Sequence, residues 1–189
     1  MKYIAFGAVV GASTVPYFVQ AAQGKTPSRR YLRPPGAFSE SKFLADCIRC
    51  GKCGEACPNR AINFFGLENG LASLDTPYII PREQACILCM KCGDACPTGA
   101  LKPIVREAED IIAHVKMGKA RVDTNLCLSY QGKTCGVCYR ACLLHDVAMP
   151  VGYLEQPHVL GACVGCGLCE RSCIQIPQAV VVIPYRMEA

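Results

Sequence analysis

Residues 47–57 read CIRCGKCGEAC, in which four cysteines follow the spacing C-x2-C-x2-C-x3-C. The same spacing recurs at residues 86–96 (CILCMKCGDAC) and at residues 163–173 (CVGCGLCERSC). Residues 127–142 (CLSYQGKTCGVCYRAC) repeat it with a first gap that has grown to seven residues. The chain therefore carries one short pattern four times, and the fold must be built around these repeats.

The four repeats, called groups one to four here, account for all 16 cysteines of the 189-residue chain. They are Cys47, Cys50, Cys53 and Cys57; Cys86, Cys89, Cys92 and Cys96; Cys127, Cys135, Cys138 and Cys142; and Cys163, Cys166, Cys169 and Cys173. With none left over, each group supplies enough ligands for one metal centre.

The spacing is that of bacterial [4Fe–4S] ferredoxins, in which three thiolates on a tight loop hold one cluster and the fourth reaches a neighbouring cluster. We therefore expect four [4Fe–4S] clusters, with all sixteen cysteines as iron ligands. Disulfides would not explain four copies of a ferredoxin spacing, and structural zinc usually joins two separated C-x2-C pairs. No C-x-x-C-H motif for covalent haem occurs. Leu143 and Ile174 replace the proline that follows the last cysteine in groups one and two, without loss of a ligand.

The formal charge of +5 comes from the N-terminus. Residues 1–33 hold five basic residues and no acid, so 15 basic and 15 acidic residues remain in 34–189. This distribution argues against a nucleic-acid partner. Because an oxidised cluster with four thiolates carries roughly −2, the loaded body is expected to be acidic and its partners to present basic surfaces.

Residues 3–22 contain no charge and are long enough to cross a bilayer as a helix. They are only moderately apolar, so an export signal with a cleavage site after Val19-Gln20-Ala21 remains an alternative to a retained membrane anchor. The basic residues between Lys25 and Arg33 would favour a cytoplasmic body by the positive-inside rule. However, Met1-Lys2 before an apolar run resembles the end of a twin-arginine export signal, which would place the body outside. We interpret Ser28 to Arg33 as a basic juxtamembrane stretch.

Short strands are expected around groups one and two at 61–65 and 77–80, and around groups three and four at 147–151 and 157–160, with outer strands at 120–123 and 179–183. This outline favours tandem pairing, one with two and three with four. Nested pairing, one with four and two with three, stays open. The predicted fold class is α+β, with two bacterial-type dicluster ferredoxin modules and an N-terminal apolar helix.

The expected organisation has five parts. Residues 1–23 form the anchor or export signal, 24–37 a basic, proline-rich linker, 38–104 the module with groups one and two, 105–119 a connecting helix, and 120–189 the module with groups three and four. Apolar residues at helical spacing extend the expected amphipathic helix over 104–117, ended by Gly118. His114, His145 and His158 have no ligand spacing and are interpreted as surface or capping residues; a structural role is also expected for Tyr139 and Arg140.

Residues 33–37 (RPPGA), residues 76–78 (TPY), the long-gapped group three ending in CGVCYRAC, and C-x-G-C-G-x-C-E in group four together resemble the NapG/MauM family of ferredoxin-type proteins. The resemblance spans about residues 33–183. It implies four [4Fe–4S] clusters, export by the twin-arginine route, and electron transfer beside a polytopic membrane protein that oxidises quinol. An arginine pair before the apolar run, which that route requires, is not in the sequence.

The sequence has no set of catalytic acids, bases or nucleophiles. Our first hypothesis is an electron-transfer protein, attached through residues 3–22 to the periplasmic face of a bacterial cytoplasmic membrane. It would relay single electrons from a polytopic membrane quinol-oxidising protein to a periplasmic reductase or cytochrome c. Two alternatives are an iron-sulfur subunit of a larger complex, such as a molybdopterin enzyme or hydrogenase, and a maturation factor.

Overall fold

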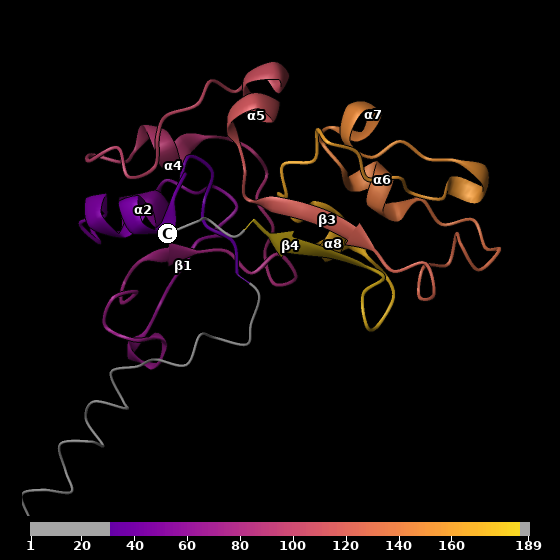
Figure 1. The fold of residues 1–189 in the computed structure, drawn as a ribbon, viewed down its shortest axis with the longest axis horizontal. Helices are drawn as coiled ribbons and strands as arrows, with labels where there is room; N and C mark the ends of the chain where they lie inside the picture. Colours follow the sequence, from indigo (N-terminus) through magenta and orange to yellow (C-terminus); the bar gives the residue numbers. More distant parts are fainter. Residues whose placement is uncertain (1–30, 186–189) are drawn as a thin grey trace, which may run out of the picture.

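The computed structural model describes residues 31–185, which form short helices and strands joined by long loops (Figure 1). The elements of the first half are α2 (Glu40–Asp46), α3 (Lys52–Glu55), β1 (Asn63–Phe64), the 3-10 turn η1 (Leu67–Asn69), β2 (Pro77–Tyr78), α4 (Lys91–Asp94) and α5 (Ala108–His114). Those of the second half are β3 (Gly118–Val122), α6 (Val137–Ala141), α7 (His145–Ala148), the 3-10 turn η2 (Tyr153–Glu155), α8 (Leu168–Ser172) and β4 (Val180–Pro184).

Two antiparallel strand pairs lie where the sequence predicts them. In the first half β1 pairs with β2, with Asn63 opposite Tyr78 and Phe64 opposite Pro77. In the second half β3 pairs with β4 over five residues, from Gly118 opposite Pro184 to Val122 opposite Val180. Helix α3 packs against α4, and α6 against α8. The described chain is a mixture of short helices and two two-stranded antiparallel sheets.

The strands predicted at 147–151 and 157–160 are wrong. Val147 lies in helix α7, and the two segments share only the isolated bridge between Val151 and Pro157. Pro150 and Pro157 have no N–H to donate to a ladder, and helix α7 takes up His145–Ala148, so these segments do not build a regular strand pair. Instead the His158 amide donates to the Pro150 carbonyl (2.9 Å) and the Leu160 amide to the Ala148 carbonyl (2.9 Å).

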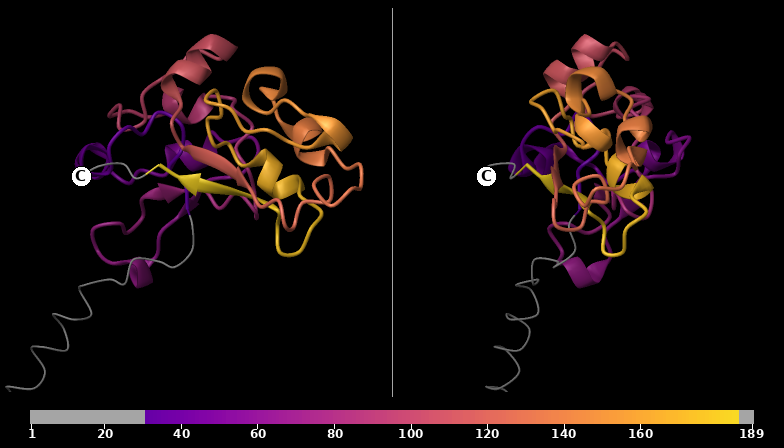
Figure 2. Two further views of the ribbon diagram at one scale, coloured as in Figure 1. Left: turned by 45° about the vertical axis from the view of Figure 1, so that its right-hand side comes forward. Right: turned by 90° about the vertical axis from the view of Figure 1, so that its right-hand side faces the viewer.

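One hydrophobic core runs through both halves of the described chain. It combines Leu32, Ile79 and Leu88 from the first half with residues such as Met149 and Val180 from the second. A smaller core around Phe43 and Leu101 supports groups one and two. The halves lie side by side along the longest axis (Figures 1 and 2), and burying apolar surface between them stabilises their relative position.

The connecting helix is shorter than expected. Helix α5 covers Ala108–His114, and the buried side chains of Ile111 and Val115 face the shared core. The chain leaves the helix because the Met117 amide donates to the Val164 carbonyl of group four (3.2 Å), after which Gly118 begins β3. The helix therefore begins four residues later and ends three residues earlier than its apolar spacing indicates.

Residues 32–37, which the sequence places at the end of a linker, belong to the folded body. Leu32 forms an antiparallel bridge with Ile79, and every residue from 32 to 37 is buried. Arg33 is therefore not part of an exposed juxtamembrane stretch. Gly36 has φ +90°, and a Cβ there would lie 2.4 Å from the Lys102 carbonyl oxygen, so only glycine fits this contact.

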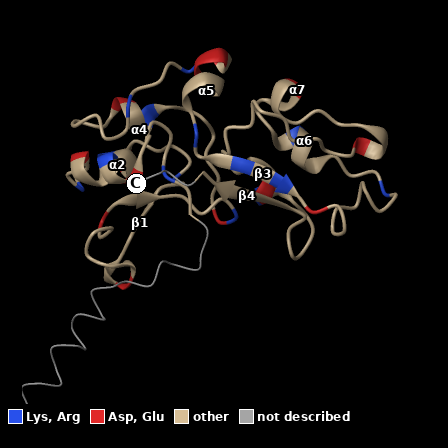
Figure 3. Cartoon of the chain, viewed as in Figure 1, with Lys and Arg blue, Asp and Glu red and all other residues tan. Residues whose placement is uncertain are grey.

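The predicted N-terminal anchor or signal, residues 1–23, lies outside the described residues. Within residues 31–185 no helix has the length and apolar character needed to cross a membrane. Lysine, arginine, aspartate and glutamate are interspersed along the described chain (Figure 3), as expected for a body whose formal charges balance.

Candidate iron-sulfur sites

Each cysteine group forms the same local structure, a tight loop that leads into a helix of four or five residues. The residue after the second cysteine is the N-cap of that helix and is left-handed in every group. These N-caps are Gly51 (φ +75°), Met90 (φ +61°), Gly136 (φ +55°) and Gly167 (φ +89°). The left-handed N-cap sets the turn between the second and third cysteines, so both sulfurs can face one centre.

A second left-handed residue precedes the second cysteine in groups one, two and four. These residues are Arg49 (φ +59°), Leu88 (φ +52°) and Gly165 (φ +76°). A non-glycine residue in this region costs of the order of 1 kcal/mol, and such strain concentrates at functional loops. Group three lacks the feature because its seven-residue gap gives Cys127 a longer path back to the loop.

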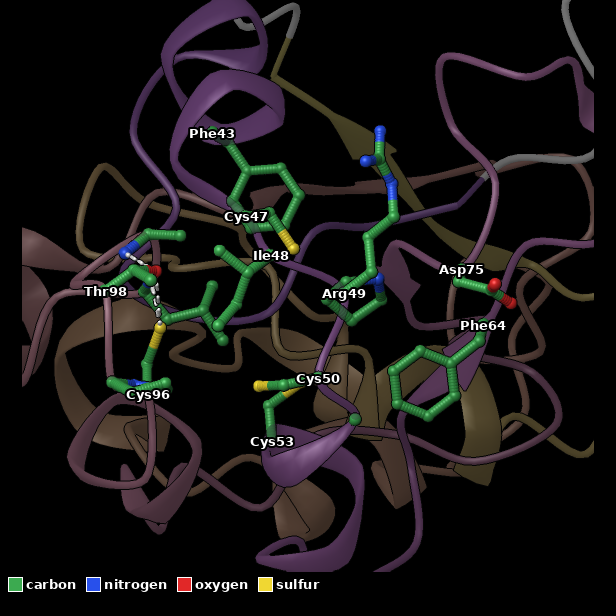
Figure 4. Close-up of a pocket in the computed structure, with 15 residues that line it drawn as sticks. Phe43, Cys47, Ile48, Arg49, Cys50, Cys53, Phe64, Asp75, Cys96 and Thr98 are labelled. Carbon is green, nitrogen blue, oxygen red and sulfur yellow. Dashed lines mark hydrogen bonds between the residues drawn. The ribbon is translucent and has the colours of Figure 1, made fainter.

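The first site, site A, combines three cysteines of group one with the last cysteine of group two. Cys47, Cys50, Cys53 and Cys96 line one cavity of about 360 Å³, mouth included. Figure 4 shows their sulfur atoms around this space, with Ile48 among them. The fourth ligand thus comes from the neighbouring group, as the ferredoxin spacing predicts.

Two further cavities repeat this exchange in the second half. Site C is lined by Cys163, Cys166 and Cys169 of group four together with Cys142 of group three (about 390 Å³). Site D is lined by Cys127, Cys135 and Cys138 of group three together with Cys173 of group four (about 330 Å³). Groups three and four therefore exchange their last cysteines.

The four remaining cysteines, Cys57, Cys86, Cys89 and Cys92, are assigned to site B because sites A, C and D take the other twelve. Burial, with a smaller part from charge on nearby Cys89, Cys53 and Cys57, raises the pKa of the Cys92 thiol to about 12. Burial also raises the pKa of Cys86, with smaller parts from charge on Cys166 of site C and on Cys92 and Cys89. Groups one and two thus exchange their last cysteines, and the structure has the tandem pairing rather than the nested one.

Hydrogen bonds to sulfur surround three of the sites. Backbone amides donate at 3.4 Å to the sulfurs of Cys57, Cys86, Cys96 and Cys163, from Ala61, Leu88, Leu101 and Ala120 respectively. The Thr98 hydroxyl lies 3.7 Å from Cys96 Sγ. Burial tends to raise the pKa of Cys96, but these bonds from Leu101 and Thr98 bring it below its ordinary value. Such donors stabilise the negative charge of a thiolate-bound cluster.

The charge balance of these sites fits a metal cluster. Burial raises the pKa of Cys53 and Cys138 to about 11 and that of Cys166 to about 12, and it raises those of Cys86 and Cys169 strongly. Four thiolates cannot share such an enclosure without a compensating positive charge. Iron bound to the sulfurs would supply that charge, so the donor set fits [4Fe–4S] clusters.

The size of the sites also fits a cluster better than a single ion. Within residues 31–185 no three or more cysteine, histidine, aspartate or glutamate side chains are grouped closely enough to hold one metal ion. A structural zinc would need its four ligands at bonding distance around one point. The sulfurs surround a larger space instead, and the sixteen cysteines stay predicted ligands of [4Fe–4S] clusters.

The buried side chain of Ser129 is suited to contact a cluster at site D. It is almost fully buried, it lines the cavity, and its Oγ is the one buried side-chain nitrogen or oxygen of the described chain without a hydrogen-bond partner. A hydroxyl in this place can donate to a cluster sulfur. Since hydrogen bonds to the sulfurs set cluster potentials, the Ser129 hydroxyl would raise the potential of the site D cluster.

Ser129→Ala is therefore expected to lower the reduction potential of one cluster and leave the other three unchanged. Redox titration followed by electron paramagnetic resonance measures this, with the exposed Ser41→Ala as the matched control. Four unchanged potentials in Ser129→Ala would show that the hydroxyl makes no bond to the cluster.

The sites follow one another in a fixed order. Charge on Cys53 of site A acts on Cys92 of site B, and charge on Cys138 of site D acts on Cys169 of site C. Between the halves, the Cys86 amide of site B donates to the Cys166 carbonyl of site C (3.0 Å). Leu88, which lies in the site B loop, also lines site C. The order is A, B, C, D, with the two ends in different halves.

Two glycines allow close packing of the group four loop. A Cβ on Gly167 would lie 2.5 Å from Pro81 Cβ of the first half, and one on Gly165 would lie 2.4 Å from the Gly118 carbonyl oxygen of β3. Both glycines also have positive φ. A side chain on Gly167 would therefore push the two halves apart, and one on Gly165 would push group four away from β3.

Two arginines that the sequence did not single out bridge the halves. Arg82 donates to the carbonyls of Glu170 (3.1 Å), Arg171 (2.9 Å) and Cys173 (3.0 Å) at the end of α8. Arg171 donates in return to the Glu83 carbonyl and the Gln84 side chain. These reciprocal bonds hold α8, which carries Cys169 of site C, against the first half. Their acceptors are mostly backbone carbonyls, which leave no signature in a sequence.

The polar residues singled out by sequence have structural partners. The His114 ring lies 3.0 Å from the Asp110 carbonyl, and the His145 ring packs edge-on against Tyr139. The His158 ring packs edge-on against Tyr130. Arg140 pairs with Glu155 (2.6 Å) and donates to the Cys135 carbonyl, so it supports the site D loop. None of these three histidines lines sites A, C or D.

Comparisons with known proteins agree with this architecture. Residues 46–100 match the 4Fe-4S dicluster domain family. The chain is 38% identical over 171 residues to the ferredoxin-type protein NapG of Escherichia coli (strain K12), which covers 82% of this chain and 71% of that protein. It is 38% identical over 192 residues to the methylamine utilization ferredoxin-type protein MauM of Methylophilus methylotrophus, which covers 94% of this chain and 83% of that protein. It is 35% identical over 194 residues to MauM of Paracoccus denitrificans (strain Pd 1222), which covers 93% and 82%.

Proposed function

Because the chain belongs to the NapG/MauM family of ferredoxin-type proteins, we propose that it relays single electrons through four [4Fe–4S] clusters. The donor is a polytopic membrane protein that oxidises quinol, and the acceptor is a periplasmic redox enzyme or cytochrome c. Residues 3–22 attach the chain to the periplasmic face of a bacterial cytoplasmic membrane. The protein serves this relay without a catalytic centre of its own.

The observation that carries this proposal is the ordered row of four cysteine sites. When bound, a [4Fe–4S] cluster accepts and releases one electron at a time. The exchange of last cysteines joins A to B and C to D, and the contact of Cys86 with Cys166 joins B to C. A row with no missing step is what electron transfer between two separate partners requires.

The protein environment differs along the row in a way that suits a relay. Sites B, C and D each contain at least one buried cysteine, whereas Cys50 of site A is exposed. Burial keeps water away from a site, and exposure of an end site lets a partner approach closely. The chain thus insulates the inner sites and opens the row at site A.

The proposal is tested on the full-length protein purified without oxygen. We expect about sixteen irons and sixteen acid-labile sulfides per chain. We also expect membranes of the source organism, from a strain lacking this gene, to reduce the protein when a quinol is added. Loss of its visible absorbance measures that reduction.

Two results would contradict the proposal. A content of about eight irons per chain, or zinc in place of iron, would contradict the prediction of four clusters. The protein could also carry its full iron content and still not be reduced by quinol, in membranes that oxidise the quinol with other acceptors. That result would contradict the proposed membrane donor. Membranes without quinol serve as the control for reduction by other routes.

A further inference from the structure

The chain enters the folded body beside site A. Leu32 bridges Ile79, just after β2, and the Arg33 guanidinium donates to the Pro77 carbonyl (2.8 Å). The same guanidinium lies 4.8 Å from the centre of the Phe43 ring. Phe43 and Pro77 both line the site A cavity. The start of the described chain is therefore fixed to the wall of site A and cannot move independently of it.

The surface around site A is apolar. Ile48 lines the cavity and is 62% exposed, and Phe64 lines it and is 38% exposed. Leu67 and Leu71, each 69% exposed, follow in the loop between β1 and β2. Arg49 ties this loop to group one, because it donates to the carbonyls of Ala72 (3.3 Å) and Leu74 (2.9 Å). We call Ile48, Phe64, Leu67 and Leu71 the site A face.

Site D lies at the opposite end of the molecule. Figures 1 and 2 show α2 and β1 at one end of the long axis and α6 at the other. At this far end Ile174 lines the cavity and is 61% exposed. Ile48 and Ile174 are therefore matched residues, of the same type, the same exposure and the same relation to an end site.

The sequence before Tyr31 limits how far site A can lie from the membrane. Only eight residues, 23–30, separate the uncharged run at 3–22 from Tyr31. Fully extended, eight residues span at most about 30 Å. With residues 3–22 in the bilayer, the attachment beside Pro77 keeps site A close to the membrane surface, and site D is the end directed away from it.

We infer that the site A face docks on the membrane protein that oxidises quinol, so that electrons enter the row at site A and leave it at site D. This inference rests on the proposed function. Oxidation of one quinol to quinone releases two electrons and two protons at the membrane protein. The electrons pass singly to site A, and each leaves at site D to reduce a one-electron acceptor in solution. The two protons pass to the solvent at the membrane partner and do not enter the row.

Hydrogen exchange tests the docking surface without depending on turnover. The full-length holoprotein is compared in detergent, on vesicles of plain phospholipid, and on source-organism membranes that contain the quinol-oxidising protein. We expect slower amide exchange in residues 46–51 and 64–75 on the native membranes alone, and unchanged exchange in residues 173–178.

Matched substitutions test the direction. Ile48→Glu places a charge at the centre of the site A face and is expected to slow quinol-dependent reduction by about tenfold or more, the effect of losing one central interface contact. Ile174→Glu is expected to leave that rate unchanged and to slow oxidation of the reduced protein by cytochrome c. Both variants must retain the wild-type iron content for the rates to be compared.

The outcomes separate the two levels of the proposal. Slower amide exchange in residues 173–178 in place of 64–75 would overturn the inferred direction of electron flow and leave the relay intact. Slower reduction by membranes in Ile174→Glu than in Ile48→Glu would do the same. Protection on plain phospholipid equal to that on native membranes would assign the site A face to lipid and overturn the docking. A wild-type protein that quinol and membranes cannot reduce would overturn the relay itself.

Discussion

Replacing Cys166 with alanine is expected to remove about four of sixteen irons and to stop electron transfer between the two halves. Cys166 is a predicted ligand at site C, and its carbonyl accepts the bond from Cys86 that joins sites B and C. No other site spans the gap between B and D. Changes next to metal ligands cost roughly 10- to 100-fold, and loss of the ligand itself should exceed this.

The same substitution is expected to destabilise the fold, because the free energy of metal binding is also free energy of folding in such domains. Site C is lined by Ala120 and Val182 of the β3–β4 pair and by Leu88 of the first half. Loss of its cluster would leave this enclosure with three thiols that iron no longer links to one another. The variant should lose its remaining clusters at a lower temperature than the wild type.

Cys50→Ala is the matched comparison, since Cys50 is exposed and belongs to an end site. It should also lose about four irons, yet sites B, C and D would still form a connected row. Iron analysis, thermal loss of visible absorbance and reduction by a soluble donor measure the three effects. A Cys166→Ala protein with sixteen irons and wild-type stability would show that Cys166 binds no cluster.

Cysteine spacing predicts most of the local structure of the sites. In groups one, two and four it places three sulfurs on one tight loop, and the left-handed residues on both sides of the second cysteine provide the physical cause. The spacing also predicts that last cysteines are exchanged. It does not say between which groups, because that depends on packing of α3 on α4 and of α6 on α8. Four copies of one pattern carry no information on partner choice.

Proline explains where strand prediction failed. The segments at 147–151 and 157–160 have the apolar residues of strands, but Pro150 and Pro157 remove two of the donors that a ladder needs. The same limit does not apply to β3 and β4, where Ala120 and Val182 are opposite each other in an uninterrupted register. Proline is tolerated at the ends of β2 (Pro77) and β4 (Pro184). The segment at 147–151 fails as a strand because helix α7 also takes up Val147.

Arg33 shows how a buried charge can be mistaken for a surface one. In sequence it is one of several arginines after an apolar run, and its neighbours Arg29 and Arg30 share that pattern. Its side chain is only 3% exposed and pairs with Glu40. The difference lies in residues 7 to 44 positions further along the chain, from Glu40 to Pro77, which surround it only after folding. Periodicity and local composition cannot detect such a site.

Arg33→Met is expected to lower the midpoint of thermal unfolding by about 6–12 °C. The guanidinium donates to Glu40 Oε2 (2.9 Å), Thr76 Oγ1 (3.0 Å) and the Pro77 carbonyl (2.8 Å), and it lies 5.3 Å from the centre of the Phe65 ring. Removing one member of a buried charge pair costs about 3–5 kcal/mol, and the lower end applies here because Glu40 is 29% exposed. At the lower end of that range, and at about 2–4 °C per kcal/mol for a protein of this size, the stated shift follows.

Lys42→Ala is the control, because Lys42 pairs with Asp46 on the surface of the same helix, α2 (2.9 Å). Such exposed pairs contribute about 0.3–0.5 kcal/mol, so its midpoint should fall by less than about 2 °C. Arg33→Lys keeps the charge but not the planar fork that reaches Glu40, Thr76 and Pro77 together, and it should lie between the two. Thermal scans of the holoprotein at one fixed rate measure all three. Equal midpoints for Arg33→Met and Lys42→Ala would mean that the buried guanidinium does not hold the chain entry against site A, and the docking geometry inferred from that attachment would fall with it.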